Sequence, residues 1–322
     1  MIRHAWAPVA LASVALLGFA RPSAAAVAGF NTSAGYDADD LAITADTFAV
    51  APDGRFAVGT GSTVTVYNHA DPAGRAALAT ITSPKFKTLG GLAFQGADTL
   101  LVTDNTFLSG AILSAAISSG TVSTLAAPGT ANDVAQVRVR PTDGSAFAVL
   151  SHNPGQGAVV EVTGSGVSPF AGGLGTGYLG GLAFDAAGNV YVGDTNDPNF
   201  MGAAGKVLEL SGAGALLGSA SLAGGGGHGV YDVNGFNGDY YATTGNTLTR
   251  LNGGVATQVG AFTGAYPFPT DVAIDSTGVL VNGNYTGVGG VFRVRPAGSV
   301  PEPASLALLA IGMLPFLRTR RR

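Results

Sequence analysis

A unit of about 45 residues recurs along this chain, and this recurrence restricts the possible folds more than any single motif does. The clearest copies are residues 89–94 and 179–184, which both read Leu-Gly-Gly-Leu-Ala-Phe. Each copy leads through a turn into a run of residues that favour strands, at 100–104 and 190–194. A weaker copy lies halfway between them, at 137–150. A chain with such a period is built from copies of one supersecondary unit, each packed against its neighbours.

Extending the period in both directions gives six units between residues 48 and 295. In each unit the first two runs are apolar on both faces, as expected of strands buried between neighbouring sheets, and the third run alternates. Most units add a fourth run. The third runs are 64–67, 111–117, 159–162, 206–210, 247–251 and 291–295. Four-stranded units of about 45 residues are typical of propeller blades, so the sequence predicts an all-β, six-bladed β-propeller of four-stranded antiparallel blades.

Composition agrees with this fold class. Glycine accounts for 50 of the 322 residues, 46% of the residues are hydrophobic and 11% are charged. Such a chain is too apolar to be disordered, and glycine at this frequency disfavours helices and favours turns. The chain has no cysteine. Its core must therefore hold the fold without disulfides, which a body of about 270 residues can do.

The sixth unit lacks a fourth run, because only residues 296–299 separate it from a distinctive C-terminal segment. A propeller closes its ring to avoid an open sheet edge, and a strand from the N-terminus can complete the last blade. We therefore predict that an N-terminal strand at 28–32 pairs beside 291–295.

The N-terminus is typical of a secretory signal peptide. Residues 1–4 form a short basic start, 5–20 an apolar run, and 24–26 are three alanines that suit a cleavage site. We expect residues 1–26 to be removed and the propeller to occupy 27–299. A retained membrane anchor is the alternative, although the apolar run is short for a spanning helix.

The C-terminal segment, 300–322, has three parts in order. Pro301, Glu302 and Pro303 precede an apolar run at 305–317, and a basic end follows, made of Arg318, Arg320, Arg321 and Arg322. This arrangement resembles the PEP-CTERM sorting signal of Gram-negative bacteria, which implies recognition by an exosortase-type membrane protease. The resemblance further implies transient inner-membrane anchoring by 305–317, followed by release to the cell surface or the extracellular space. A simple tail anchor is the alternative.

The net charge of −4 combines two basic ends with an acidic body. Removing the six arginines of the two ends and Glu302 leaves 10 Lys and Arg against 19 Asp and Glu in 27–299, a net charge near −9. Phosphate binding needs a basic stripe, and the body has none, so we expect no nucleic-acid partner.

Polar residues recur where the loops enter the first strand and leave the second strand of a unit, which places them near the propeller axis. A ring of such oxygen and nitrogen ligands would suit a hard cation such as Ca²⁺ in the central channel. Alternatively, these residues end strands because they cap turns. The candidate axial residues are Asp104, Asp133, His152, Asp194, Asn196, His228, Asp271 and Asn284.

The turns, such as Pro52-Asp53-Gly54, and the strands that follow them resemble those of NHL-type and gluconolactonase-like six-bladed propellers. The resemblance to gluconolactonases implies an axial divalent metal held by a Glu, by Asn residues and by an Asp. Asp271 fits the Asp position, whereas Gly90 and Gly180 stand where an Asn is expected. No Glu precedes Glu161.

Because these ligands are missing, we assign no catalytic residue and expect a binding or structural protein of the cell surface or matrix. Its expected partners are an exopolysaccharide or a surface protein, with Tyr178, Phe200, Tyr266 and Phe268 available to stack on sugar rings. The alternative is a metal-dependent, lactonase-like hydrolase with an axial Ca²⁺ site.

Overall fold

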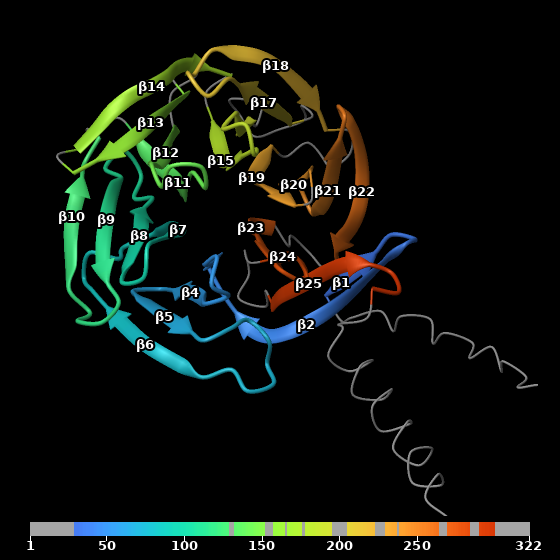
Figure 1. The fold of residues 1–322 in the computed structure, drawn as a ribbon, viewed down its shortest axis with the longest axis horizontal. Coiled ribbons are helices and arrows are strands. Elements are labelled where there is room, and N and C mark those ends of the chain that lie inside the picture. Colours follow the sequence, from blue (N-terminus) through green and yellow to red (C-terminus); the bar gives the residue numbers. More distant parts are fainter. Residues whose placement is uncertain are drawn as a thin grey trace, which may run out of the picture.

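The computed structural model describes residues 29–128, 132–151, 157–164, 166–175, 178–194, 205–222, 229–236, 238–263, 269–283 and 290–299. They form strands β1 to β25, arranged as six antiparallel sheets around a central axis (Figure 1). The described segments contain no helix, and hence none that could cross a membrane. The predicted six-bladed propeller is confirmed. The predicted signal peptide and C-terminal sorting segment lie outside the described residues.

Each blade runs from a first strand at the axis to a fourth strand at the rim, and the blades are numbered in chain order. The first strands are β3 (Thr47–Val50), β7 (Leu89–Gln95), β11 (Asp133–Val139), β15 (Leu179–Phe184), β19 (Val230–Phe236) and β23 (Pro269–Asp275). The second strands are β4 (Phe56–Thr60), β8 (Thr99–Asp104), β12 (Ala146–Ser151), β16 (Val190–Asp194), β20 (Asp239–Thr244) and β24 (Gly278–Gly283).

The outer halves of the blades follow the same order. The third strands are β5 (Thr63–Tyr67), β9 (Ala111–Ala116), β13 (Gly157–Thr163), β17 (Lys206–Leu210), β21 (Thr247–Asn252) and β25 (Gly290–Pro296). The fourth strands are β6 (Ala77–Thr82), β10 (Val122–Ala126), β14 (Gly166–Leu174), β18 (Leu216–Ser221), β22 (Val255–Phe262) and, in blade 6, β2 (Tyr36–Thr44). One short strand, β1 (Phe30–Thr32), adds a fifth strand to blade 5.

An N-terminal strand closes the ring, as predicted, but it is not the predicted segment. β2 pairs with β25, with Asp37 opposite Arg295, and the two strands lie side by side in Figure 1, blue against red. The prediction that 28–32 would take this place is wrong, because β1 pairs with β22 of blade 5 instead. The aromatic ring of Phe30 explains this, since it packs between Phe262 and Phe292 at the junction of blades 5 and 6.

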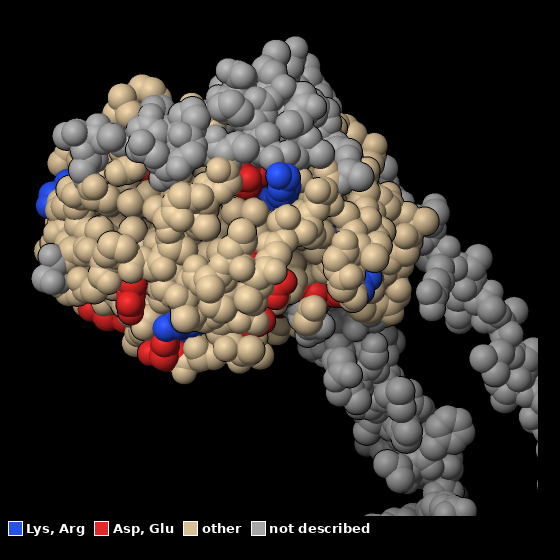
Figure 2. Space-filling model, turned by 90° about the horizontal axis from the view of Figure 1, so that it is seen from above, with Lys and Arg blue, Asp and Glu red and all other residues tan. Residues whose placement is uncertain are grey.

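The hydrophobic core lies between the blades. Separate clusters of buried side chains join every neighbouring pair of blades, including blade 6 and blade 1, where Phe48 and Phe56 pack with Leu280 and Val291. This arrangement follows from first and second strands that are apolar on both faces. Figure 2 shows one side of the ring, on which charged side chains are few and acids and bases are interspersed.

A β-bulge interrupts the pairing near the start of the first strand in blades 2 to 6. In three of these blades, a side chain of the second strand accepts a hydrogen bond from the bulged backbone. Gly91 N donates to Thr103 Oγ1 at 2.6 Å, Asp232 N to Thr243 Oγ1 at 3.0 Å, and Asp271 N to Asn282 Oδ1 at 2.9 Å. The bulges thereby set which side chains reach the axis.

Candidate functional site

The first strands bring equivalent residues of the six blades together in successive layers along the axis. We call the layer of Thr47, Gly91, Gln136, Gly181, Asp232 and Asp271 the axial ring. Residues one position earlier in blades 1 to 5 line a cavity on one side of this ring. Residues two positions later in blades 1, 2, 3, 5 and 6, Arg138 and Asn234 among them, line a second cavity on the other side. The channel is thus divided into two cups by the side chains of the axial ring.

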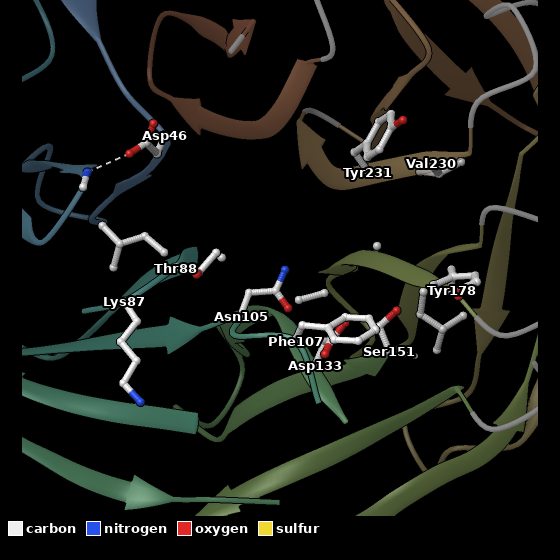
Figure 3. A pocket seen from close by; sticks show the side chains of 16 residues that line it. Asp46, Lys87, Thr88, Asn105, Phe107, Asp133, Ser151, Tyr178, Val230 and Tyr231 are labelled. Atoms are coloured by element: carbon white, nitrogen blue, oxygen red, sulfur yellow. Dashed lines mark hydrogen bonds between the residues drawn. The ribbon is translucent and has the colours of Figure 1, made fainter. Parts of the chain in front are cut away.

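The larger cavity, which we call the axial cup, has a volume of about 660 Å³. Figure 3 shows its lining, with Asp46 on a different side from Asn105 and Asp133. Polar side chains outnumber large apolar ones among the lining residues. The polar lining residues are Asp46, Lys87, Thr88, Asn105, Asp133, Ser151, Tyr178 and Tyr231.

Two carboxylates of the axial cup hold loops at its rim. Asp46 Oδ2 accepts a hydrogen bond from Gly61 N at 2.7 Å, and Asp133 Oδ1 accepts one from Leu108 N at 2.6 Å. Leu108 has a φ of 56°, a conformation that costs energy for a residue with a branched side chain. The bond to Asp133 therefore holds the loop after β8 in an otherwise unfavourable shape.

Asn105 contributes an unsatisfied hydrogen-bond acceptor to the lining of the axial cup. Its side-chain oxygen is buried and has no hydrogen-bond partner among the described residues. Buried polar atoms are nearly always partnered, so a hydroxyl group of a bound molecule, or a water, is expected at this oxygen.

Gly90 and Gly180 also line the axial cup, and the structure explains why no side chain stands there. A Cβ at Gly90 would lie 2.8 Å from the carbonyl oxygen of Ala135, and one at Gly180 would lie 2.1 Å from that of Val230. The first strand of the next blade therefore occupies the space that an asparagine would need. The two positions cannot supply metal ligands.

The other candidate residues from the sequence are distributed as follows. Asp104 is buried at the end of β8, where Oδ1 accepts hydrogen bonds from Thr88 N at 3.0 Å and Thr106 Oγ1 at 2.6 Å. Asp194, at the end of β16, is also buried, and its carboxylate packs against Gly175. Asp133 lines the cup and Asp271 lies in the axial ring. His152, Asn196, His228 and Asn284 lie outside the described residues.

Asp271 is fully occupied by protein donors. Its Oδ2 accepts hydrogen bonds from Thr47 Oγ1 at 2.6 Å and Phe48 N at 2.9 Å. Its Oδ1 accepts from Gln136 Nε2 at 3.2 Å and from Arg138 Nη2 at 3.1 Å. This one carboxylate therefore ties blade 6 to blades 1 and 3 across the axis.

Arg138 completes the network with a second carboxylate, Asp232. Arg138 Nη2 lies 2.6 Å from Asp232 Oδ2, which also accepts a hydrogen bond from Val272 N at 2.8 Å. Burial raises the pKa of Asp232 well above its usual range, against the opposing effect of the Arg138 charge. Burial alone would lower the pKa of Arg138, but Asp232 and Asp271 outweigh it, so that the guanidinium pKa is raised.

The network of Gln136, Arg138 and Asp232 was missed in the sequence analysis, which looked only at loop positions. A signal was present in the repeat itself. Aligned on the first strands, Arg138 stands where four other units have alanine, and Asp232 stands where 91 and 181 are glycine. A charged residue that departs from a repeat of small residues indicates a site shared between the units.

A divalent metal does not fit the axial ring. The oxygens of Asp271 are already bonded to four donors, and a guanidinium lies against both axial carboxylates. Within the described ranges, no group of three His, Asp or Glu side chains could hold an ion. The axial Ca²⁺ of the alternative hypothesis has no ligand set at Asp271.

No family model and no curated protein matches the chain. Among solved structures, it is similar to a gluconolactonase from Xanthomonas campestris, with a TM-score of 0.61 and 15% identity, over 86% of this chain and 99% of that one. A putative gluconolactonase is similar with a TM-score of 0.57 and 13% identity, over 83% of this chain and 94% of that one. A chain of a nidogen and laminin complex is similar with a TM-score of 0.50 and 16% identity, over 64% of this chain and 74% of that one.

The fold and these neighbours define the class: the chain has a six-bladed propeller fold of the gluconolactonase-like kind. This corrects the expectation of a structural or binding protein of the cell surface. Two solved structures that resemble most of the chain are a gluconolactonase and a putative gluconolactonase, and this likeness of fold favours the lactonase-like alternative over the surface protein. The earlier expectation rested on the C-terminal segment and on missing metal ligands, and neither bears on what the axial cup binds.

Proposed function

We propose that the protein hydrolyses a small lactone or related ester in the axial cup, without a metal at Asp271. The observation that supports this best is the cup itself, a cavity of about 660 Å³ with several polar side chains in its lining, at one mouth of a gluconolactonase-like propeller. Its volume lies within the range of small-molecule sites, which is about 300 to 1,000 Å³. Its carboxylates, amide and hydroxyls suit a ligand rich in hydroxyl groups.

Lactone hydrolysis needs a base that takes a proton from the attacking water. We assign this role to Asp133, which lines the cup at the start of β11 and is held in place by Leu108 N. Asn105 lines the cup with it, and its unpartnered oxygen would accept a hydrogen bond from a ligand hydroxyl. Ser151, from the neighbouring β12, adds a hydroxyl donor to the same wall.

The proposal is tested by following proton release from a panel of sugar lactones with the full chain, with and without Ca²⁺ and with a chelator. We expect hydrolysis above the spontaneous rate in the chelator. Asp133→Asn should lower kcat by about 100-fold or more, because a general base contributes at least that much. Asn retains the acceptor for Leu108 N, so the loop should stay in place.

Asp143→Asn is the matched control. Asp143 belongs to the same blade, but it lies in the turn after β11, paired with Arg140. This variant should retain the wild-type kcat. Rates equal to the spontaneous ones for every lactone, with and without Ca²⁺, would overturn the proposal.

We further propose that the chain is exported by residues 1–26 and sorted by residues 300–322. The support is the order of the C-terminal parts: the motif of Pro301, Glu302 and Pro303, the apolar run and the four terminal arginines. In a host with an exosortase-type protease, the released chain should end near the motif by mass spectrometry. Replacing the three motif residues by alanine should leave it uncut and membrane-bound, and cleavage of that variant would contradict the proposal.

A further inference from the structure

The axial ring contains a cation that belongs to the protein. Arg138 extends from β11 of blade 3, and its side chain is 11% exposed. Four oxygens from other blades accept hydrogen bonds from its two terminal nitrogens: Asp232 Oδ2 at 2.6 Å, Asp271 Oδ1 at 3.1 Å, Val272 O at 3.1 Å and Leu92 O at 3.3 Å. These oxygens come from blades 2, 5 and 6. The guanidinium thus has the surroundings, two carboxylates and two carbonyls, that proteins otherwise offer to a hard cation.

The remaining blades are joined to the same group. Thr47 and Phe48 of blade 1 donate to Asp271. In blade 4, a Cβ at Gly181 would lie 1.6 Å from Asp232 Oδ1, so the Asp232 carboxylate fits only because residue 181 has no side chain. In blade 2, a Cβ at Gly91 would likewise lie 1.6 Å from Gln136 Oε1. All six blades therefore meet around one positive charge.

Charge balance explains why the cation is needed. Asp232 and Asp271 are 0% and 1% exposed, so two carboxylates face each other without solvent at the axis. Two buried acids at close range repel each other unless a positive charge stands between them. Glycine at 91 and 181 leaves Asp232 and Asp271 as the two carboxylates of the axial ring. Nη2 of the guanidinium contacts both carboxylates, at 2.6 Å from Asp232 Oδ2 and 3.1 Å from Asp271 Oδ1.

We propose that Arg138 takes the place of a divalent metal at the axis of this propeller. The wild-type fold then needs no metal, and removing the Arg138 side chain creates a requirement for Ca²⁺. This inference goes beyond the proposed hydrolysis and does not depend on it. Its readouts are thermal stability and bound metal, which report on the axis whether or not the cup is catalytic.

The test compares melting temperatures of the full chain in Ca²⁺ and in chelator. For the wild type, we expect the same Tm in both and no bound metal by elemental analysis. For Arg138→Ala, the two carboxylates lose their partner, and the Tm in chelator should fall by about 10 °C. About 10 mM Ca²⁺ should then raise the Tm of this variant by about 3 °C or more, because the ion binds the carboxylates that Arg138 leaves behind.

Two further variants keep the test decisive if Arg138→Ala does not fold. Arg138→Lys retains the charge, so it should fold with an intermediate Tm and show no response to Ca²⁺. Arg138→Ala combined with Asp232→Asn removes one charge of each sign and should regain part of the lost stability. Lys85→Ala is the control, because it removes an exposed cation away from the axial ring and should leave the Tm nearly unchanged.

Three results would overturn the inference. The first is a wild-type Tm that rises with Ca²⁺ or falls in chelator. The second is an Arg138→Ala variant as stable as the wild type in chelator. The third is an Arg138→Lys variant that responds to Ca²⁺ as strongly as the alanine variant does.

Discussion

At the scale of single residues, glycine decides what the axis can hold. Gly181 and Gly91 occupy the axial ring at positions where any side chain would overlap a polar group of the neighbouring blade. Glycine is needed at these two positions because side chains of the neighbouring blades approach the backbone closely, and not because the backbone has an unusual conformation. Because the axis is shared by six strands, each side chain placed there excludes another, and the glycines leave room for Asp232 and Gln136.

We predict that Gly181→Ala destabilises the protein by about 1–3 kcal/mol, as overpacking of a buried site does. The new Cβ would meet Asp232, which is bonded to Arg138 and cannot move freely. Chemical denaturation measures the free energy of unfolding. Gly218→Ala is the control, since a Cβ there meets nothing within 4 Å, and this variant should change stability by less than about 0.5 kcal/mol. If both substitutions changed the free energy of unfolding equally, the axial ring would have space for an additional methyl group.

At the scale of elements, charge and aromatic packing assign the two N-terminal strands to different blades. β2 carries Asp37 and Asp39 opposite Arg295 and Arg293, and Arg295 Nη1 lies 2.7 Å from Asp39 Oδ2. The acidic run and the alternating arginines of β25 are both visible in the sequence. The sequence analysis overlooked them because it took the segment directly after the expected signal peptide, where only Phe30 is a large apolar residue.

Engineered disulfides test this register in a chain that has no cysteine. Asp37→Cys with Arg295→Cys should form an intramolecular disulfide on oxidation, because the two Cα atoms face each other across the strand pair. Asn31→Cys with Ala261→Cys should also close, since β1 pairs with β22. Asn31→Cys with Arg293→Cys should stay reduced. Thiol counting and mass spectrometry distinguish these outcomes, and closure of the last pair would place β1 in blade 6 after all.

At the scale of the whole molecule, packing between the blades and the pairing of β2 with β25 close the ring. Hydrophobic clusters join all neighbouring blades, and the one between blades 6 and 1 contains Leu41, carried by β2. Loss of β2 would expose the edge of β25 and uncover this cluster at the same time. An open edge of this kind pairs with other chains.

We predict that deleting residues 36–44 yields a protein that aggregates and melts well below the wild type. A synthetic peptide of residues 36–44 added in trans should raise the Tm in proportion to the logarithm of its concentration, because it binds only the folded ring. A peptide with Leu41→Asp is the control and should have little effect, since Leu41 is 1% exposed in the native ring. A deletion variant that is monomeric and as stable as the wild type would show that closure does not depend on β2.

Much of the fold could be predicted from the sequence, and less of the site. The repeat at 89 and 179 predicted the six blades because each blade is a local structure with its own turns and apolar runs. The axial network could not be predicted in the same way, because Arg138 and Asp271 are 133 positions apart in the chain. Asp104 and Asp133, chosen as axial residues, bind backbone and side-chain donors of loops at the mouth of the channel.

The amino-acid sequence by itself determined the class of fold, the number of blades and the two distinctive ends, because periodicity and composition are local properties of a chain. Only the tertiary structure decided which strand closes the ring and which cation lies at the axis. Both depend on contacts between residues that are distant in the sequence, where the packing of six blades around one line leaves space for some side chains and excludes others.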